Sequence, residues 1–131
     1  MQFVLTEEQR LLRDQVRDML TREAEPETLR RLITDEAGWK PELWRSMAEL
    51  GLTGAAIPEA FGGVGLGLLD LCVVCEELGR AVAPVPYFSS VCMAGEAILL
   101  AGSEAQKARW LPGIASGETI ATLAWAEGSV A

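Results

Sequence analysis

Helix-start signals are the feature that most restricts the fold of this sequence. Two residue pairs have the spacing of a capping box, Thr6 with Gln9 and Ser103 with Gln106. In a capping box, a hydroxyl and a glutamine side chain accept hydrogen bonds from two otherwise unpaired backbone N–H groups. Each pair therefore predicts the beginning of a helix. After the first, four apolar residues recur at helical spacing until Glu25-Pro26 interrupts the pattern, namely Leu12, Val16, Met19 and Leu20.

Further segments have helical patterns between these two signals. A short amphipathic helix is predicted over 27–33, and another from Pro41, a good first helical residue, to Gly51. Apolar residues cover more than half of a helix predicted over 68–82, namely Leu68, Leu71, Cys72, Cys75, Leu78 and Val82. The stretch 87–100 is almost uncharged and predicts a buried helix, and Pro112-Gly113 should close the last one.

Residues 51–67 contain many glycines and Pro58, which forbid a regular helix and predict a loop with positive φ angles. The run from Gly62 to Gly67 invites comparison with a phosphate-binding loop. It lacks the Gly-Lys-Ser/Thr ending of a P-loop and does not follow a predicted strand. A structural turn is therefore the favoured interpretation over nucleotide binding.

The residues from Thr119 to Trp125 are β-branched and apolar and predict a single strand, which needs a partner to complete a sheet. We therefore expect two units, a helical domain over 1–117 and the beginning of a β-domain over 118–131. The fold class that follows is all-α, an orthogonal or up-and-down bundle of five to six helices with one strand starting at the C-terminus.

Composition restricts the function. The 131 residues carry a formal net charge of −8, which disfavours nucleic acid and anionic membrane surfaces as partners. Histidine is absent, so imidazole catalysis and histidine-containing zinc sites are excluded. No apolar stretch approaches the ~20 residues of a membrane span, and the N-terminus lacks the pattern of a signal peptide. We therefore expect a cytoplasmic protein with reduced cysteines.

Three features could carry chemistry, and each also has a structural interpretation. Cys72 and Cys75 have CxxC spacing, but a zinc site needs about four ligands, so core packing is favoured and no metal ligand is assigned. Glu76 and Glu77 are adjacent and diverge on a helix, which favours a solvated face or a salt bridge. Glu96 stands in an apolar helix, where a hydrogen bond or ion pair competes with the role of a general base.

Several short segments, in order, resemble the N-terminal helical domain of acyl-CoA dehydrogenases. They cover nearly the whole chain and are LGL (50–52), IPE (57–59), FGGxG (61–65), EELG (76–79), AGSEAQK (101–107), WLP (110–112) and GE (117–118).

The resemblance implies an FAD-dependent oxidoreductase of lipid degradation, with a helical domain, a middle β-domain and a C-terminal four-helix bundle. Its members α,β-desaturate an acyl-CoA thioester. A glutamate removes the α-proton, the β-hydride passes to N5 of FAD, and electrons leave to an electron-transfer flavoprotein. The assembly is a homo- or hetero-oligomer, a dimer or tetramer. In this family the glutamate base lies in the C-terminal bundle, beyond residue 131, so no catalytic residue is assigned here.

Two sets of site residues follow from the resemblance. The segment 123–127 is similar to one that contacts the flavin ring, which implies cofactor contacts from Leu123, Trp125, Ala126 and Ser129. Ala126 stands where the family has a Ser or Thr hydroxyl, and the following loop is shortened, which weighs against FAD binding by this chain. The helix after Pro86 resembles the one that lines the acyl channel, which implies substrate contacts from Ser89, Ser90 and Met93; ordinary helix packing is the alternative.

These observations leave three functions open. The first is the N-terminal part of an acyl-CoA dehydrogenase, inactive alone. The second is a partner subunit without flavin, or an assembly domain, in a heteromeric enzyme. The third is a free-standing helical interaction module.

Overall fold

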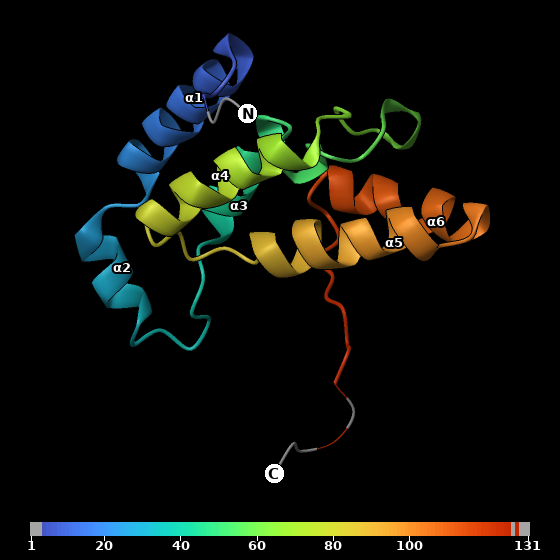
Figure 1. Cartoon of the computed structure of the whole chain (residues 1–131). Coiled ribbons are helices and arrows are strands. Elements are labelled where there is room, and N and C mark those ends of the chain that lie inside the picture. The colour runs from blue at the N-terminus through green and yellow to red at the C-terminus, as the bar shows by residue number, and fades with distance from the viewer. Residues whose placement is uncertain (1–3, 127, 129–131) are drawn as a thin grey trace.

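The computed structural model describes residues 4–126 and 128, and their regular structure is helical (Figure 1). The α-helices are α1 (Glu7–Glu23), α2 (Pro26–Leu32), α3 (Pro41–Glu49), α4 (Leu68–Arg80), α5 (Glu96–Ala101) and α6 (Glu104–Ala115). A π-helix, η3 (Phe88–Gly95), leads directly into α5, and two short 3-10 turns, η1 (Leu52–Gly54) and η2 (Glu59–Phe61), lie in the glycine-rich loop. The predicted all-α fold is confirmed.

Both predicted capping boxes are present. The Thr6 hydroxyl accepts the N–H of Gln9 at 3.1 Å, and the Gln9 side chain accepts the N–H of Thr6 at 3.1 Å. Ser103 and Gln106 make the same reciprocal pair before α6, at 2.8 and 3.3 Å. Helices α2 and α3 begin instead with a proline, whose missing N–H costs nothing in the first turn. Local sequence therefore sets where these helices begin.

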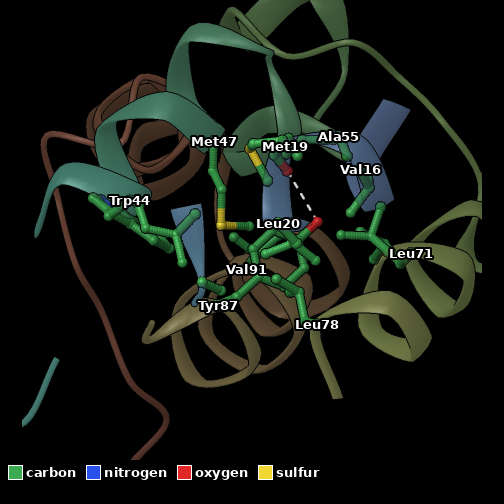
Figure 2. Close-up of a cluster of buried hydrophobic side chains, with 14 residues drawn as sticks. Val16, Met19, Leu20, Trp44, Met47, Ala55, Leu71, Leu78, Tyr87 and Val91 are labelled. Carbon is green, nitrogen blue, oxygen red and sulfur yellow. Dashed lines mark hydrogen bonds between the residues drawn. The ribbon is translucent and has the colours of Figure 1, made fainter. Parts of the chain in front are cut away.

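The larger core lies where α1 packs along α4 and where α3 and the start of η3 close the other sides (Figure 2). The predicted stripe of α1 is confirmed, since Val16, Met19 and Leu20 are buried and Leu12 packs against them. The Tyr87 ring is also fully buried, and its hydroxyl donates to the carbonyl of Leu52 at 3.0 Å. This bond satisfies a phenol that would otherwise be costly to bury.

The glycine-rich segment is a folded turn, as predicted. Gly51, Gly62 and Gly65 have φ of +75°, +82° and +74°, a region that favours glycine. The N–H groups of Val64 and Leu66 donate to carbonyls of the same loop, at 2.9 and 2.7 Å. A Cβ at Gly63 would collide with the carbonyl of Ile57. The loop uses its amides internally, which is the behaviour of a structural turn and not of a phosphate cradle.

The predicted burial of α4 is partly wrong. Leu71 and Leu78 are buried, but Leu68 is 64% exposed, Cys72 is exposed and Val82 lies beyond the helix at 71% exposure. The reason is that α4 packs mainly on α1, so the buried face is centred on Leu71, Val74 and Leu78. Val73 and Glu77 are buried as well, although the sequence pattern predicted burial of Leu68 and Cys72 instead.

A second, smaller core joins α5 and α6 to the glycine-rich loop. Its buried members are Ile57, Leu111, Ile114 and Ala115. The prediction that Pro112-Gly113 closes the last helix is wrong, because α6 continues to Ala115. Pro112 removes one backbone donor, but its carbonyl still accepts the N–H of Ser116 at 3.0 Å, so the final turn forms around it. The predicted helix over 87–100 is correct in place but is π-helical in its first half.

Residues 119–126 run in an extended conformation away from the helices (Figure 1). They form no ladder with any other described residue, so the strand over 119–125 and the domain boundary after Gly117 stay predictions. The start of the segment is nevertheless held firmly. The carbonyl of Gly117 accepts the indole N–H of Trp44 at 2.8 Å, and the N–H of Thr119 donates to the carbonyl of Gly113 at 2.9 Å.

Candidate functional site

A surface groove of about 650 Å³ lies between α5, α6 and the extended segment. Its walls are mostly small or apolar, with Ala97, Ala101 and Ile98 from α5, Trp110 and Ile114 from α6, and residues 119–123 from the segment. The bulky apolar residues on its rim remain accessible, since Trp110 is 42% and Leu123 41% exposed. A mostly apolar concave surface of this size is typical of ligand sites.

Ser90 positions the extended segment against the helices. Its side chain is fully buried, and its hydroxyl accepts the N–H of Ala121 at 3.1 Å. On the α6 side, a Cβ at Gly113 would collide with the Thr119 side chain, so this glycine permits the close approach of the segment. This anchoring role is not predicted by any sequence motif, and its only signal in the sequence is that residues 90 and 113 are small.

The three residues expected at the acyl chain differ in accessibility. Ser89 and Met93 are partly exposed and stand one turn apart on η3, and the Ser89 hydroxyl donates to the Pro86 carbonyl at 3.1 Å. Ser90 is buried, and its hydroxyl accepts the N–H of Ala121. None of the three lines the groove, whose contribution from η3 is Ala94. The π-helical form of η3 is itself informative, because such turns are rare and occur frequently at functional sites.

The residues expected at the flavin lie along the extended segment, apart from Ser129, which is outside the described residues. Leu123 lines the groove, and Trp125 is 78% exposed. Ala126 is exposed and, as its side chain is a methyl group, offers a ligand only its backbone. Within the described part of the chain, the amides of 122–126 make no backbone hydrogen bond. These backbone donors and acceptors are therefore not used by the other described residues, and groups of this type can hold a flavin ring edge.

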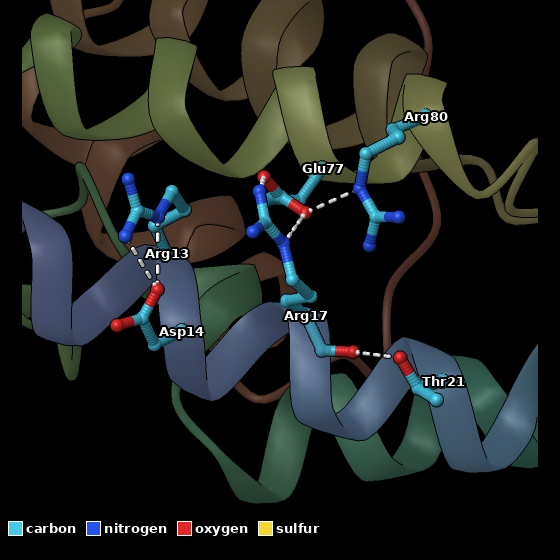
Figure 3. Close-up of polar contacts among 6 residues, drawn as sticks. All are labelled: Arg13, Asp14, Arg17, Thr21, Glu77 and Arg80. Atoms are coloured by element: carbon cyan, nitrogen blue, oxygen red, sulfur yellow. Dashed lines mark hydrogen bonds and ion pairs between the residues drawn. The ribbon is translucent and has the colours of Figure 1, made fainter.

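Glu77 is the one buried carboxylate among the described residues, and it is neutralised by two arginines (Figure 3). Its side chain is 2% exposed and accepts two bonds from Arg17, at 2.6 and 2.9 Å, and one from Arg80 at 2.8 Å. The hydrogen bonds from Arg17 lower the Glu77 pKa from 4.5 to about 2, and the Arg17 pKa is raised in return. This confirms the salt bridge and joins α1 to α4, so Glu77 is a structural group and not an acid or base.

The other two candidate features are resolved differently. Cys72 and Cys75 do not act together, because Cys72 is exposed while the Cys75 sulfur contacts that of Cys92 at 3.6 Å. Core packing is thus correct for Cys75 and wrong for Cys72. Glu96 is partly exposed, and its carboxylate makes no hydrogen bond or ion pair with other described residues, so the expected interhelical bond is not found. Neither feature adds a catalytic group to the groove.

The comparison with known families decides the identity of this fold. The model of the acyl-CoA dehydrogenase N-terminal domain matches residues 6–118, nearly the whole helical region. The chain belongs to the acyl-CoA dehydrogenase family. Its members are oxidoreductases, and the helices described above are their N-terminal domain.

Individual relatives agree with this assignment. The chain is 41% identical over 87 residues to the acyl-CoA dehydrogenase IpdE2 of Mycolicibacterium smegmatis, covering 66% of this chain and 28% of that protein. It is 39% identical over 124 residues to (2S)-methylsuccinyl-CoA dehydrogenase of Cereibacter sphaeroides, covering 94% of this chain and 22% of the relative. The chain thus spans about a quarter of the length of these curated relatives.

Solved structures contain the same arrangement of helices. A variant of the Tcur3481–Tcur3483 steroid ACAD is 42% identical with a TM-score of 0.86, and the match covers 95% of this chain and 34% of that one. The ChsE4–ChsE5 complex from Mycobacterium tuberculosis is 34% identical, also with a TM-score of 0.86, over 93% and 34% of the two chains. An acyl-CoA dehydrogenase complexed with FAD from Bacillus anthracis is 31% identical with a TM-score of 0.80, over 89% and 20%. Among the described residues, no helix is long and apolar enough to cross a bilayer.

Proposed function

We propose that this chain is the N-terminal part of an FAD-dependent acyl-CoA dehydrogenase that desaturates an acyl-CoA thioester and is inactive alone. The observation that carries the proposal is the match of residues 6–118 to the N-terminal domain of this family, together with an accessible apolar groove beside an extended segment. The catalytic base belongs to residues after 131, electron-transfer flavoprotein is the electron acceptor, and the cytoplasm is the location expected from the sequence.

The contacts with the acyl chain are made by the accessible face of η3. Ser89 and Met93 share this face and are partly exposed, so both can line an acyl channel, and methionine is an adaptable wall. Ser90 supports the channel from behind, since its hydroxyl is committed to Ala121. A small residue at Ser89 leaves room beside the chain, and Ser89→Leu should therefore shorten the longest acyl chain accepted.

The flavin contribution falls to the backbone of residues 122–126. The free amides of this segment support contact with a flavin ring, with Leu123 and Trp125 beside it, and Ser129 is proposed at the same edge. FAD supplies the acceptor for the β-hydride when it is bound. The residues of this chain would contact the flavin through backbone N–H and C=O groups and apolar side chains, because Ala126 has no hydroxyl to donate.

The test is to express the protein with the remainder of its dehydrogenase and to follow flavin absorbance as acyl-CoA is added. A yellow protein that is bleached by acyl-CoA supports the proposal. The variant Ala126→Thr restores a hydroxyl at the flavin edge and should raise flavin occupancy, while Ala124→Thr places the same group one pleat away and is the matched control. A colourless protein that binds neither flavin nor acyl-CoA with any partner would contradict the proposal.

A second candidate function is a subunit of a heteromeric dehydrogenase that does not itself hold flavin. Ala126 favours it, because the hydroxyl expected at the flavin is missing. Two of the similar solved structures have paired names, the ChsE4–ChsE5 complex and Tcur3481–Tcur3483. If this second function is correct, the protein expressed with the remainder of its own subunit stays colourless but restores activity to a flavin-containing partner. If the first function is correct, the same protein is yellow without a partner subunit.

A further inference from the structure

Two cysteines from different helices lie in contact at the edge of the larger core. Cys75 is on α4 and Cys92 on η3, and their sulfur atoms are 3.6 Å apart although the residues are 17 positions apart in the sequence. Both side chains are partly exposed. We propose that Cys75 and Cys92 are a modification site, a dithiol that a hydroperoxide oxidises to an intramolecular disulfide.

The geometry requires only a small movement. An S–S bond is about 2.05 Å long, so the two sulfurs must approach by roughly 1.5 Å, within reach of side-chain rotations. The CxxC spacing suggests Cys72 as the partner, but Cys72 is exposed, and its sulfur is in hydrogen-bond contact with no sulfur of another described residue. Contact in three dimensions therefore selects Cys92, which the linear motif does not include.

A small oxidant can reach the pair. Cys75 lines a surface hollow of about 490 Å³ between the end of α4 and the start of η3, with Val82 and Phe88 on its walls. Both of these residues are largely exposed, at 71% and 65%. The hydrogen bond from the Cys92 thiol lowers the Cys75 pKa to about 7, and the same interaction raises the pKa of Cys92. Of the two thiols, Cys75 is therefore the one that ionises more readily, with the Cys92 thiol close enough to donate to its sulfur.

The chemistry balances with one hydroperoxide. The Cys75 thiolate attacks an oxygen of the peroxide, the O–O bond breaks, and a sulfenic acid forms on Cys75 while hydroxide or alkoxide leaves and takes a proton. The Cys92 sulfur then attacks the Cys75 sulfur, its proton goes to the departing oxygen, and water is released. Two electrons pass from the two sulfurs to the peroxide, and the new disulfide joins α4 to η3, the helix of Ser89 and Met93.

The experiment treats the full chain with hydrogen peroxide under native conditions, blocks the remaining thiols with iodoacetamide, and maps disulfides by peptide mass spectrometry. We expect the Cys75–Cys92 peptide pair in roughly tenfold excess over the other two pairings combined, because only this pair starts in contact. The same treatment in urea should yield all three pairings. Reductant should return the thiols.

Cysteine variants test whether the disulfide forms between Cys75 and Cys92. Cys72→Ser is the matched control and should keep the cross-link, whereas Cys92→Ser should abolish it and leave Cys75 as a trapped sulfenic acid. The proposal is wrong if native oxidation yields mainly Cys72 disulfides or intermolecular dimers, or if all three thiols survive a peroxide dose that oxidises a free thiol in solution. Since the wild-type and Cys72→Ser maps suffice, a folding defect in Cys92→Ser leaves the test intact.

Discussion

The two cores of this domain differ in how completely they are closed. Around α1, α3 and α4, the larger cluster of apolar side chains is buried, and the buried carboxylate of Glu77 is paired with two arginines. Around α5, α6 and the extended segment, the buried cluster is small, and apolar side chains remain exposed, including Leu100 at 84% and Trp125 at 78% exposure. The first region holds the larger buried core, and the second region has the smaller core and borders the groove and the extended segment.

The same substitution in both cores should show the largest contrast. Leu43→Ala and Leu111→Ala each remove a fully buried side chain. We expect Leu43→Ala to lower the free energy of unfolding by about 4–5 kcal/mol, because its surroundings cannot collapse, and Leu111→Ala by about 2–3 kcal/mol, because its cluster borders an open groove. Urea unfolding measures both. Equal losses would remove the distinction between the two regions.

The ion pair of the first region should make its stability pH-dependent. Glu77→Gln removes the charge that both arginines neutralise, and we expect a loss of about 2 kcal/mol at pH 7. The folded pKa of Glu77 is lowered to about 2 from 4.5, so the unfolded state binds more protons between these values. The contribution is therefore complete above pH 4.5 and is lost as the pH falls towards 2.

This pH dependence can be isolated by difference. The melting temperature of the wild type should fall more steeply than that of Glu77→Gln between pH 4.5 and pH 2, and the two curves should converge at the acid end. Glu76→Gln is a suitable control, because that neighbouring carboxylate is exposed. Parallel curves for the wild type and Glu77→Gln would show that the pair does not stabilise the fold.

The second region depends on single anchors. Ser90→Ala deletes the acceptor of the Ala121 N–H, and we expect it to cost about 1 kcal/mol. Hydrogen exchange at Ala121 should accelerate by roughly tenfold or less, with α1 unaffected. The control is Ser89→Ala, whose hydroxyl bonds only the local Pro86 carbonyl. If both variants leave exchange at Ala121 unchanged, Ser90 does not hold the segment.

The smallest effects concern the two capping boxes, which are alike in geometry and lie in different regions. Thr6→Ala and Ser103→Ala should each cost about 0.5–1 kcal/mol, because each removes the acceptor of an N–H in the first turn. Circular dichroism during thermal unfolding measures this loss. A cost near zero at Ser103 alone would indicate that α6 is held by packing and not by its cap.

Much of the fold was predictable from local signals. The signals are the two capping boxes, the proline that begins α3 and the apolar stripe on α1. Each lies within a few neighbouring residues, and the structure confirms them. The face of α4 was not predictable in the same way. Leu68 and Cys72 are as apolar as Leu71 and Val74, and only the packing of α1 decides which of them is buried.

The site was predictable only through the family resemblance. Small serines and a short apolar segment have no chemistry of their own, so nothing local distinguishes Ser89, which is partly exposed, from Ser90, which is buried and bonded to Ala121. The contact between Cys75 and Cys92 is likewise a product of tertiary packing, whereas the visible CxxC pattern pointed to Cys72. Long-range contacts of this kind leave no periodic trace in one sequence.

Hydrogen exchange of the assembled flavoenzyme, with and without acyl-CoA, tests most directly whether the open region is the functional one. We predict that acyl-CoA increases protection in residues 89–98 and 119–126, while α1 and α2 exchange as before. Protection gained on α1 or α2, with residues 89–98 and 119–126 unchanged, would contradict the assignment of the accessible face of η3 to the acyl chain and of the extended segment to flavin.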